Sequence, residues 1–346
     1  YIKADKRLYM TATPRLFDDS IKGKAAEHSA ELASMDDEAI YGPEFHRLGF
    51  GEAVEKGLLT DYKVLVMTVD EEVAAEALAS VPTPDINLTT ASAMIGAWNA
   101  LAKRSGKLQG QKDGFEIDAS PMQRTVAFAK DIKSSQRISE SFPSLIETHK
   151  AQLLEHQALS GTDEQNLDLE ISAEHVDGTM NALQRSSRIS WLEADMPSNV
   201  SRVLTNARCL SEGVDVPGLD SVIFFSPRNS MVDVVQSVGR VMRKAEGKDY
   251  GYIILPVAVA PGVSPSQALN DNTRFKVVWQ ILNALRAHDD RFNAKVNSIA
   301  LNEGTMDDLP IQVEPVEDPK KKLNADDARK ADAAYDEGSL AQQVAL

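Results

Sequence analysis

Short apolar runs alternate along this chain with stretches whose apolar residues recur at helical spacing. The first run, Lys63 to Val69, is continuous, which is typical of a strand buried on both faces of a parallel sheet. Helical spacing marks Thr89 to Lys103 and His175 to Leu192. Further apolar runs lie at Thr125 to Ala129, Leu169 to Ala173, Val203 to Thr205, Ser221 to Ser226 and Tyr250 to Pro256. This alternation predicts a parallel α/β sheet.

Changes in composition divide the chain into four expected parts. Residues 1–60 hold a short extended stretch that ends at Pro14, followed by a mixed, charged connector. Residues 61–260 carry the sheet pattern. An amphipathic helix with one apolar stripe, Phe275 to Ala287, lies in an expected helical extension at 261–301. Residues 302–346 are rich in Asp, Glu, Pro, Lys and Ala, so we expect an acidic linker or tail there.

Composition and charge narrow the classes of function. The chain has 346 residues and a formal net charge of -15, which argues against a protein that coats nucleic acid through a basic surface. Any contact with a polyanion is therefore expected to be local. The single cysteine, Cys209, fits a reducing cytoplasm, and no apolar run approaches the roughly 18 residues of a membrane span. We expect a cytoplasmic protein with no membrane partner.

One segment, Val203 to Arg243, concentrates the residues that suggest chemistry. Near its end, Gln236, Gly239, Arg240 and Arg243 stand at spacings i, i+3, i+4 and i+7, which puts all four on one face of a predicted helix. Glycine inside a helix costs about 1 kcal/mol relative to alanine. A surface helix that merely carries arginines has no need of it, so this face is expected to meet a ligand.

This segment resembles the fifth and sixth signature motifs of superfamily 2 helicases. Gln236, Gly239, Arg240 and Arg243 match every fixed position of the sixth motif, Gln-x-x-Gly-Arg-x-x-Arg. The resemblance implies that Arg240 and Arg243 are arginine fingers reaching the γ-phosphate of ATP and that Gln236 positions the phosphate or the attacking water. A planar guanidinium suits the charge that spreads over phosphoryl oxygens in the transition state.

Two further motifs resemble those of the same family. For the fifth motif, the resemblance implies that Thr205 touches a backbone phosphate of the strand and that Gly213 and Asp215 lie at the nucleotide, with Asp215 near the ribose. Thr11 and Thr13, in Thr-Ala-Thr-Pro, resemble the third motif, which links hydrolysis to movement along the strand. The implied fold is a RecA-like parallel sheet of the P-loop NTPase type over residues 61–260, with helices on both faces and a helical C-terminal extension. Residues 1–60 would then be the end of a first RecA-like domain and the linker from it.

The phosphate-binding loop of such motors is missing from this sequence. No Gly-x-x-x-x-Gly-Lys-Ser/Thr occurs, so ATP and Mg are expected to be bound mainly by a preceding RecA-like domain, which leaves this chain inactive alone. Asp36 to Ala39 looks like an acidic helicase box but follows no buried strand, and we interpret it as a solvated helical turn. No metal site is predicted in the chain.

The resulting hypothesis is one ATPase half of a helicase or translocase that acts on nucleic acid, with double-stranded DNA preferred over RNA. A narrower resemblance, carried by Tyr41 to Pro43, Gly57 to Tyr62 and the helix with Trp279, is to the helicase portions of type ISP and type III restriction enzymes. The alternative is a non-catalytic helicase-like module that binds nucleic acid or a partner protein. His175 is interpreted as structural, and Ser134 with Ser135 as a helix cap, with phosphate binding at Ser134 as the other possibility.

Overall fold

The structure is a computed structural model. It describes residues 6–11, 33–81, 86–104, 120–160, 166–210, 218–228, 230–260, 275–294 and 311–316. The chain forms two compact units, Tyr1–Gly49 and Phe50–Leu346. Within the described residues, none of the helices combines the length and apolarity needed to cross a bilayer.

The first unit contains one short helix among its described residues, α2 (Glu38–Tyr41). Asp37 caps it by accepting the Ala39 N–H at 2.9 Å, and Gly42 ends it with φ at 76°, a conformation that favours glycine. Because the helix has no buried residue, the interpretation of Asp36 to Ala39 as a solvated helical turn is confirmed. Thr11 is exposed, whereas Thr13 lies outside the described residues.

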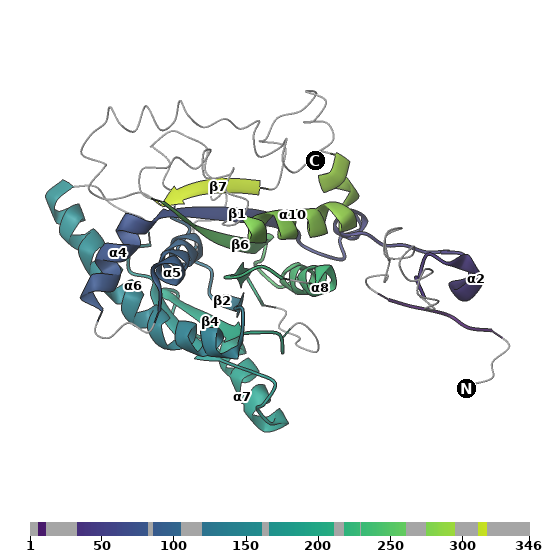
Figure 1. Cartoon of the computed structure of the whole chain (residues 1–346), viewed down its shortest axis with the longest axis horizontal. Helices are drawn as coiled ribbons and strands as arrows, with labels where there is room; N and C mark the ends of the chain where they lie inside the picture. The colour runs from purple at the N-terminus through teal and green to yellow at the C-terminus, as the bar shows by residue number, and fades with distance from the viewer. Residues whose placement is uncertain are drawn as a thin grey trace, which may run out of the picture. The chain divides into compact units, whose positions relative to one another are not determined.

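The second unit is built on a seven-stranded sheet in the order β3-β4-β2-β5-β6-β1-β7, in which every pairing is parallel. The predicted parallel α/β fold of RecA type is confirmed (Figure 1). Six of the strands match the apolar runs of the sequence. The strands are β1 (Asp61–Asp70), β2 (Arg124–Phe128), β3 (Glu170–His175), β4 (Val200–Asn206), β5 (Ser221–Phe224), β6 (Tyr250–Val259) and β7 (Ile311–Val316).

Helices cover both faces of the sheet, as the continuous apolar strands predict. On one face pack α4 (Glu71–Ser80), α5 (Leu88–Leu101) and α6 (Ile132–Ser160). On the other lie α7 (Ala182–Glu193), α8 (Met231–Val241) and α10 (Lys276–His288). The short α3 (Phe50–Glu55) precedes β1 and adds Phe50 and Val54 to this second face.

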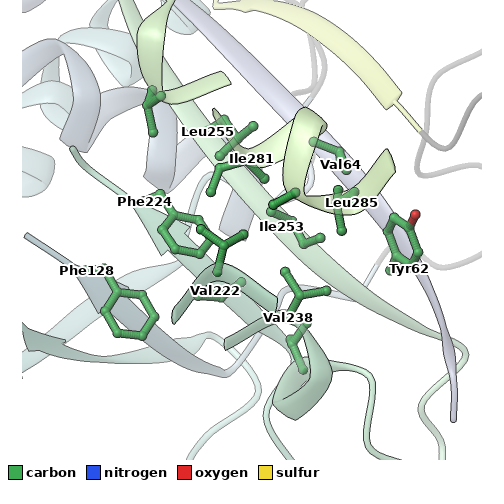
Figure 2. Close-up of a cluster of buried hydrophobic side chains, with 14 of the residues drawn as sticks. Tyr62, Val64, Phe128, Val222, Phe224, Val238, Ile253, Leu255, Ile281 and Leu285 are labelled. Carbon is green, nitrogen blue, oxygen red and sulfur yellow. The ribbon is translucent and has the colours of Figure 1, made fainter. Parts of the chain in front are cut away.

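Successive strand residues feed the two cores alternately. Val64 and Ile253 belong to the cluster beneath α8 and α10, while Leu65 and Ile254 belong to the cluster beneath α4, α5 and α6. Figure 2 shows Val238 of α8 and Ile281 and Leu285 of α10 directed at strand residues of the first cluster. Each large apolar side chain buried this way contributes about 1.5–3 kcal/mol to folding.

The C-terminal part of the chain contributes to this unit in two ways. The apolar stripe of α10, formed by Val278, Ile281, Leu282 and Leu285, is fully buried, as predicted. Residues 302–346 were expected to be a linker or tail, and this expectation is wrong for Ile311–Val316, which form β7 along the free edge of β1. The unpaired backbone groups of β1 accept an extended segment there, and the alternation of Ile311 and Val313 with Gln312 and Glu314 suits a strand.

A second correction concerns the start of α6. The helix begins at Ile132, and Asp131 accepts the Ser134 N–H at 2.7 Å, so Asp131 is its cap rather than Ser134 or Ser135. Both serines lie inside the first turn. Ser135 is fully buried there and takes part in a polar network at the end of the sheet.

Candidate functional site

Some of the candidate site residues lie at the edge where the parallel strands end. β2 ends at Phe128, β4 at Asn206 and β5 at Phe224. From β2 the chain runs to β3, toward one lateral edge of the sheet. From β4 it runs to β5, in the opposite direction along the strand order. Ligands of open α/β sheets bind at the carboxyl edge where connections diverge in this way, so this edge is the place to look for the site.

Helix α8 carries the predicted ligand-facing residues. Ser230 caps it by accepting the Asp233 N–H at 3.3 Å, and an apolar stripe that includes Val234 and Val238 packs on the sheet. Gln236, Gly239 and Arg240 share the adjoining, partly exposed face. The helix and the common face of these three residues are as predicted.

The glycine on this face is not required by the packing of the domain itself. A Cβ atom added to Gly239 would lie 3.6 Å from the Phe50 ring, an ordinary contact, with nothing nearer among the described neighbours. Arg240 lines a small cavity together with Phe128 and Ser237. Gln236 Oε1 is buried and makes no hydrogen bond within the described part of the chain. The face therefore leaves both space and hydrogen-bonding capacity uncommitted.

Arg243 does not lie on α8, which corrects the prediction of one helix through residue 243. The helix ends at Val241, and the Arg243 N–H bonds to Arg240 O at 3.1 Å in a tighter turn. Lys248 Nζ closes this turn by donating to Val241 O at 2.5 Å and Arg243 O at 3.0 Å. Burial lowers the pKa of Lys248 to about 8. The half-buried lysine thus fixes the backbone that presents Arg243.

A glycine on the neighbouring strand lets the end of α8 approach the sheet. A Cβ atom on Gly251 of β6 would lie 2.4 Å from Val241 O, a distance that no side chain tolerates. The Thr60 N–H also donates to Met242 O at 2.8 Å. The close approach and this bond explain why the chain turns away from the helix before Arg243.

Thr205, the expected phosphate contact of the fifth motif, lies inside the sheet. Its side chain is fully buried. Its hydroxyl donates to Ser135 O at 2.9 Å and accepts from Ser135 Oγ at 2.9 Å. A hydroxyl held this way has no open side for a phosphate, so in this structure Thr205 belongs to a buried network. Gly213 and Asp215 of the same motif lie outside the described residues.

The network continues through His175 to Asp177. Ser135 Oγ lies 2.7 Å from His175 Nδ1, and His175 Nε2 lies 2.9 Å from Asp177 Oδ2. Asp177 Oδ1 also accepts the N–H and hydroxyl of Thr179 at 2.7 and 2.6 Å. The bonds from Thr179 and His175 lower the pKa of Asp177 to about 2. The structural interpretation of His175 is confirmed.

Arg228 is a residue of this edge that the sequence analysis did not select. It follows β5 and is 7% exposed. Its Nη1 donates to Ala207 O at 2.5 Å, and its guanidinium lies 4.4 Å from the centre of the Phe128 ring. An arginine after Pro227 in a turn is usually exposed, so no sequence signal distinguished it. Asn206 also joins the strand ends, because its Nδ2 donates to Ala127 O at 3.1 Å.

Comparison with known proteins identifies the family. Residues 125–245 match the helicase conserved C-terminal domain. These residues form a superfamily 2 helicase C-terminal domain. The match covers β2 to the turn after α8, which includes the fifth and sixth motifs.

Two relatives extend this similarity beyond the helicase C-terminal domain. The structure titled ATP-dependent Type ISP restriction-modification enzyme LlaBIII bound to DNA shares 36% identity with this chain, covers 90% of it and superposes with a TM-score of 0.71. The probable helicase A859L of African swine fever virus is 24% identical over 290 residues, or 84% of this chain. The chain spans 19% of LlaBIII and 26% of A859L. The resemblance to type ISP restriction enzymes is confirmed.

Proposed function

We propose that this chain is the second ATPase half of an ATP-dependent helicase or translocase that acts on double-stranded DNA. The observation that carries the proposal is the partly exposed face of α8 with Gln236, Gly239 and Arg240. Its glycine is unexplained by packing and its glutamine oxygen has no hydrogen-bond partner in the described structure. Both features suit a nucleotide phosphate arriving from outside this domain.

In this proposal the two arginines act on the phosphoryl group that is transferred. Arg240 and Arg243 donate to the γ-phosphate of ATP, and Gln236 positions that phosphate or the attacking water. Charge that develops on the equatorial oxygens in the transition state is stabilised by the guanidinium forks. Gly213 and Asp215 contact the nucleotide, with Asp215 near the ribose, and Thr11 and Thr13 couple hydrolysis to movement.

Other parts of the proposal concern groups held outside this chain. ATP and its Mg²⁺ would be held mainly by a RecA-like domain that precedes this one, because no residue pattern here cradles β- and γ-phosphates. DNA is preferred over RNA as the substrate because LlaBIII, 36% identical, is a DNA-bound enzyme. For Thr205 we propose a positioning role through Ser135, since its hydroxyl is committed inside the sheet.

The test replaces Arg240 in the full-length protein. Arginine fingers typically contribute about 10³ to 10⁵ in turnover, so Arg240→Ala is expected to reduce DNA-stimulated ATP hydrolysis by a factor in that range with little change in melting temperature. Arg240→Lys should restore little, because the planar fork is lost. Arg286→Ala is the matched control, since Arg286 is a half-buried arginine on α10 that bonds Asn293.

If Arg240→Ala hydrolyses ATP at a rate within a few-fold of the parent at saturating ATP and DNA, Arg240 has no catalytic role. It would favour the alternative of a non-catalytic module that binds nucleic acid or a partner protein. Turnover by this 346-residue chain alone would contradict the dependence on a preceding domain. That assay measures phosphate release from the purified chain with and without DNA, with Arg240→Ala as the control for contamination.

A further inference from the structure

Between the end of β5 and the middle of α8, the chain carries several buried polar atoms that make no hydrogen bond among the described residues. They are Ser226 Oγ, Arg228 Nε and Nη2, and Gln236 Oε1, counted within the described residues. A buried polar group without a partner typically costs about 1–3 kcal/mol, and more when it is charged. Native structures contain few such groups, and those that persist usually have a functional reason. Gln236 belongs to the proposed site, but Ser226 and Arg228 do not.

Arg228 is the most costly member of this group. Its Nη1 donates to Ala207 O and its planar face lies over the Phe128 ring, but the described residues offer it no carboxylate within ion-pair distance. Among charged groups, Asp233 in the first turn of α8 attracts it and Arg208 repels it, and burial lowers its pKa. The attraction of Asp233 acts without an ion pair, so it compensates the buried guanidinium only in part.

The two donors of Arg228 without partners have a specific geometry. Nε and Nη2 form one side of the guanidinium, and their N–H bonds are parallel. This is the arrangement that binds two oxygens of a carboxylate or phosphate at once. The remaining nitrogen, Nη1, is occupied by Ala207 O, which orients the fork. The described structure thus holds a fixed two-pronged donor with no acceptor.

The position of this fork matches that of the candidate site. Ala207 follows β4, Phe128 ends β2 and Ser226 follows β5, so three strand ends surround Arg228. Phe128 also lines the cavity that Arg240 borders. Arg228 and Arg240 therefore both adjoin Phe128, and Arg228 itself lies at the carboxyl edge, where ligands bind in open parallel sheets.

We propose that Arg228 is a further phosphate-binding residue of this site and that Ser226 is the adjacent hydroxyl donor. This inference rests on the proposed function, because the phosphate is either that of ATP or that of the DNA backbone. Both open donors of Arg228 are shielded from water, so a phosphate reaches them only after a local shift. Satisfying two buried donors at once favours that shift.

The test uses the full-length protein with Arg228→Gln, Arg228→Lys and a matched control, Arg202→Gln. Arg202 also stacks on an aromatic ring, Trp191, and also donates to backbone carbonyls, including Ala194 O at 2.8 Å. It lies near the opposite end of β4, and neither of its terminal nitrogens lacks a partner. A purely structural role of Arg228 would therefore be reproduced by Arg202→Gln.

Two measurements distinguish the source of the phosphate. In the first, binding of a fluorescent DNA duplex without nucleotide is followed across salt concentrations. A lost DNA phosphate contact weakens binding about 10- to 100-fold in Arg228→Gln and reduces the salt slope by about one, and Arg228→Lys keeps the slope. In the second, ATP hydrolysis at saturating DNA is measured. If the lost contact is to ATP, Arg228→Gln raises KM or lowers kcat about 10- to 100-fold and leaves the salt dependence of DNA binding unchanged.

The proposal is overturned if Arg228→Gln matches Arg202→Gln in both measurements and differs from the parent only in melting temperature. If Arg228→Gln fails to fold, Arg228→Lys and Ser226→Ala carry the test, with a loss of about 3- to 10-fold expected for Ser226→Ala. The proposal is also overturned if Arg228→Lys and Ser226→Ala both keep the DNA binding and the ATP turnover of the parent. DNA-stimulated hydrolysis by the parent separates the two failures, because it supports the proposed function whatever Arg228 does.

Discussion

At the scale of single residues, the network around Thr205 combines serine, histidine and aspartate in an order that resembles a hydrolytic triad. Ser135 is fully buried, however, and its hydroxyl already bonds Thr205 and His175. A nucleophile needs access to a substrate carbonyl or phosphoryl group. These residues instead join the start of α6 to the ends of β3 and β4, and so position the strand end from which the fifth motif departs.

Replacement of Asp177 tests the contribution of this network to stability. Asp177→Asn should lower the free energy of unfolding by about 1–3 kcal/mol at pH 7, because the carboxylate accepts bonds from His175 and Thr179. The pKa of Asp177 is lowered to about 2 from its usual 3.8, so this stabilisation is fully present above about pH 5. It is lost as the pH falls through 3.8 toward 2.

The measurement is urea unfolding of parent and variant between pH 7 and pH 3.5. The difference between them should shrink below pH 4. Asp195→Asn provides the control, because Asp195 is exposed and should change stability by less than about 0.5 kcal/mol at any pH. A difference between parent and Asp177→Asn that stays constant with pH would show that the carboxylate charge is not what stabilises the network.

At the scale of elements, the C-terminal end of α8 is positioned by its neighbours. Gly251 allows Val241 O to approach β6, Thr60 donates to Met242 O, and Lys248 donates to Val241 O and Arg243 O. A lysine near a helix C-terminus also interacts favourably with the helix dipole. Arg243 therefore projects from a rigid turn rather than from the helix, although Gln236 and Arg240 lie on the helix itself.

Two glycine substitutions separate packing from ligand approach. Gly251→Ala should destabilise the domain by about 1–3 kcal/mol, because a Cβ atom would lie 2.4 Å from Val241 O and force the end of α8 away. Gly239→Ala should leave stability unchanged or raise it by up to about 1 kcal/mol, because alanine favours helix and meets only the Phe50 ring among the described neighbours.

Thermal and urea unfolding of both variants check this expectation, and ATP hydrolysis by the full-length protein gives the second half of the comparison. Gly239→Ala should reduce hydrolysis despite its intact fold, since the methyl group fills the space proposed for the nucleotide. Full activity of a stable Gly239→Ala variant would mean that no ligand approaches the helix at this position.

At the scale of the whole molecule, charge and topology constrain the proposed contact with DNA. The net charge of -15 repels a polyanion, so binding is expected to depend on a few local cations, such as Arg208 and Arg228 after the ends of β4 and β5. β7 covers the free edge of β1, which would otherwise invite pairing with another chain. The carboxyl ends of the strands are thus left for a ligand, while β7 covers the lateral edge of the sheet at β1.

The isolated 346-residue chain is expected to bind duplex DNA weakly, with a dissociation constant no tighter than about 1 µM at ~150 mM salt. Affinity should fall steeply as salt rises, because the contacts are to phosphates. Fluorescence anisotropy of a labelled duplex across salt concentrations measures both quantities. Submicromolar, salt-insensitive binding would indicate a large preformed interface that this charge balance does not predict.

The sequence by itself determined the fold class, because continuous apolar strands separated by helical spacing pack stably only as a parallel sheet covered on both faces. It also determined the family and the common helix face of Gln236, Gly239 and Arg240, since i, i+3 and i+4 spacing is a local property. These features follow from patterns within one element or one motif, which neighbours in space do not alter.

Only the tertiary structure decided the rest. The position of Arg243 beyond α8 depends on Gly251 and Thr60, which meet the end of the helix only after β6 and β1 join the sheet. Thr205 is buried because Ser135, from α6, bonds its hydroxyl, and Ile311–Val316 form a strand because β1 has a free edge. Within the described structure, Arg228 is buried without an acceptor for two of its donors because three strand ends converge around it. Contacts between distant segments set the burial and hydrogen bonding of each residue, and spacing along the chain does not encode them.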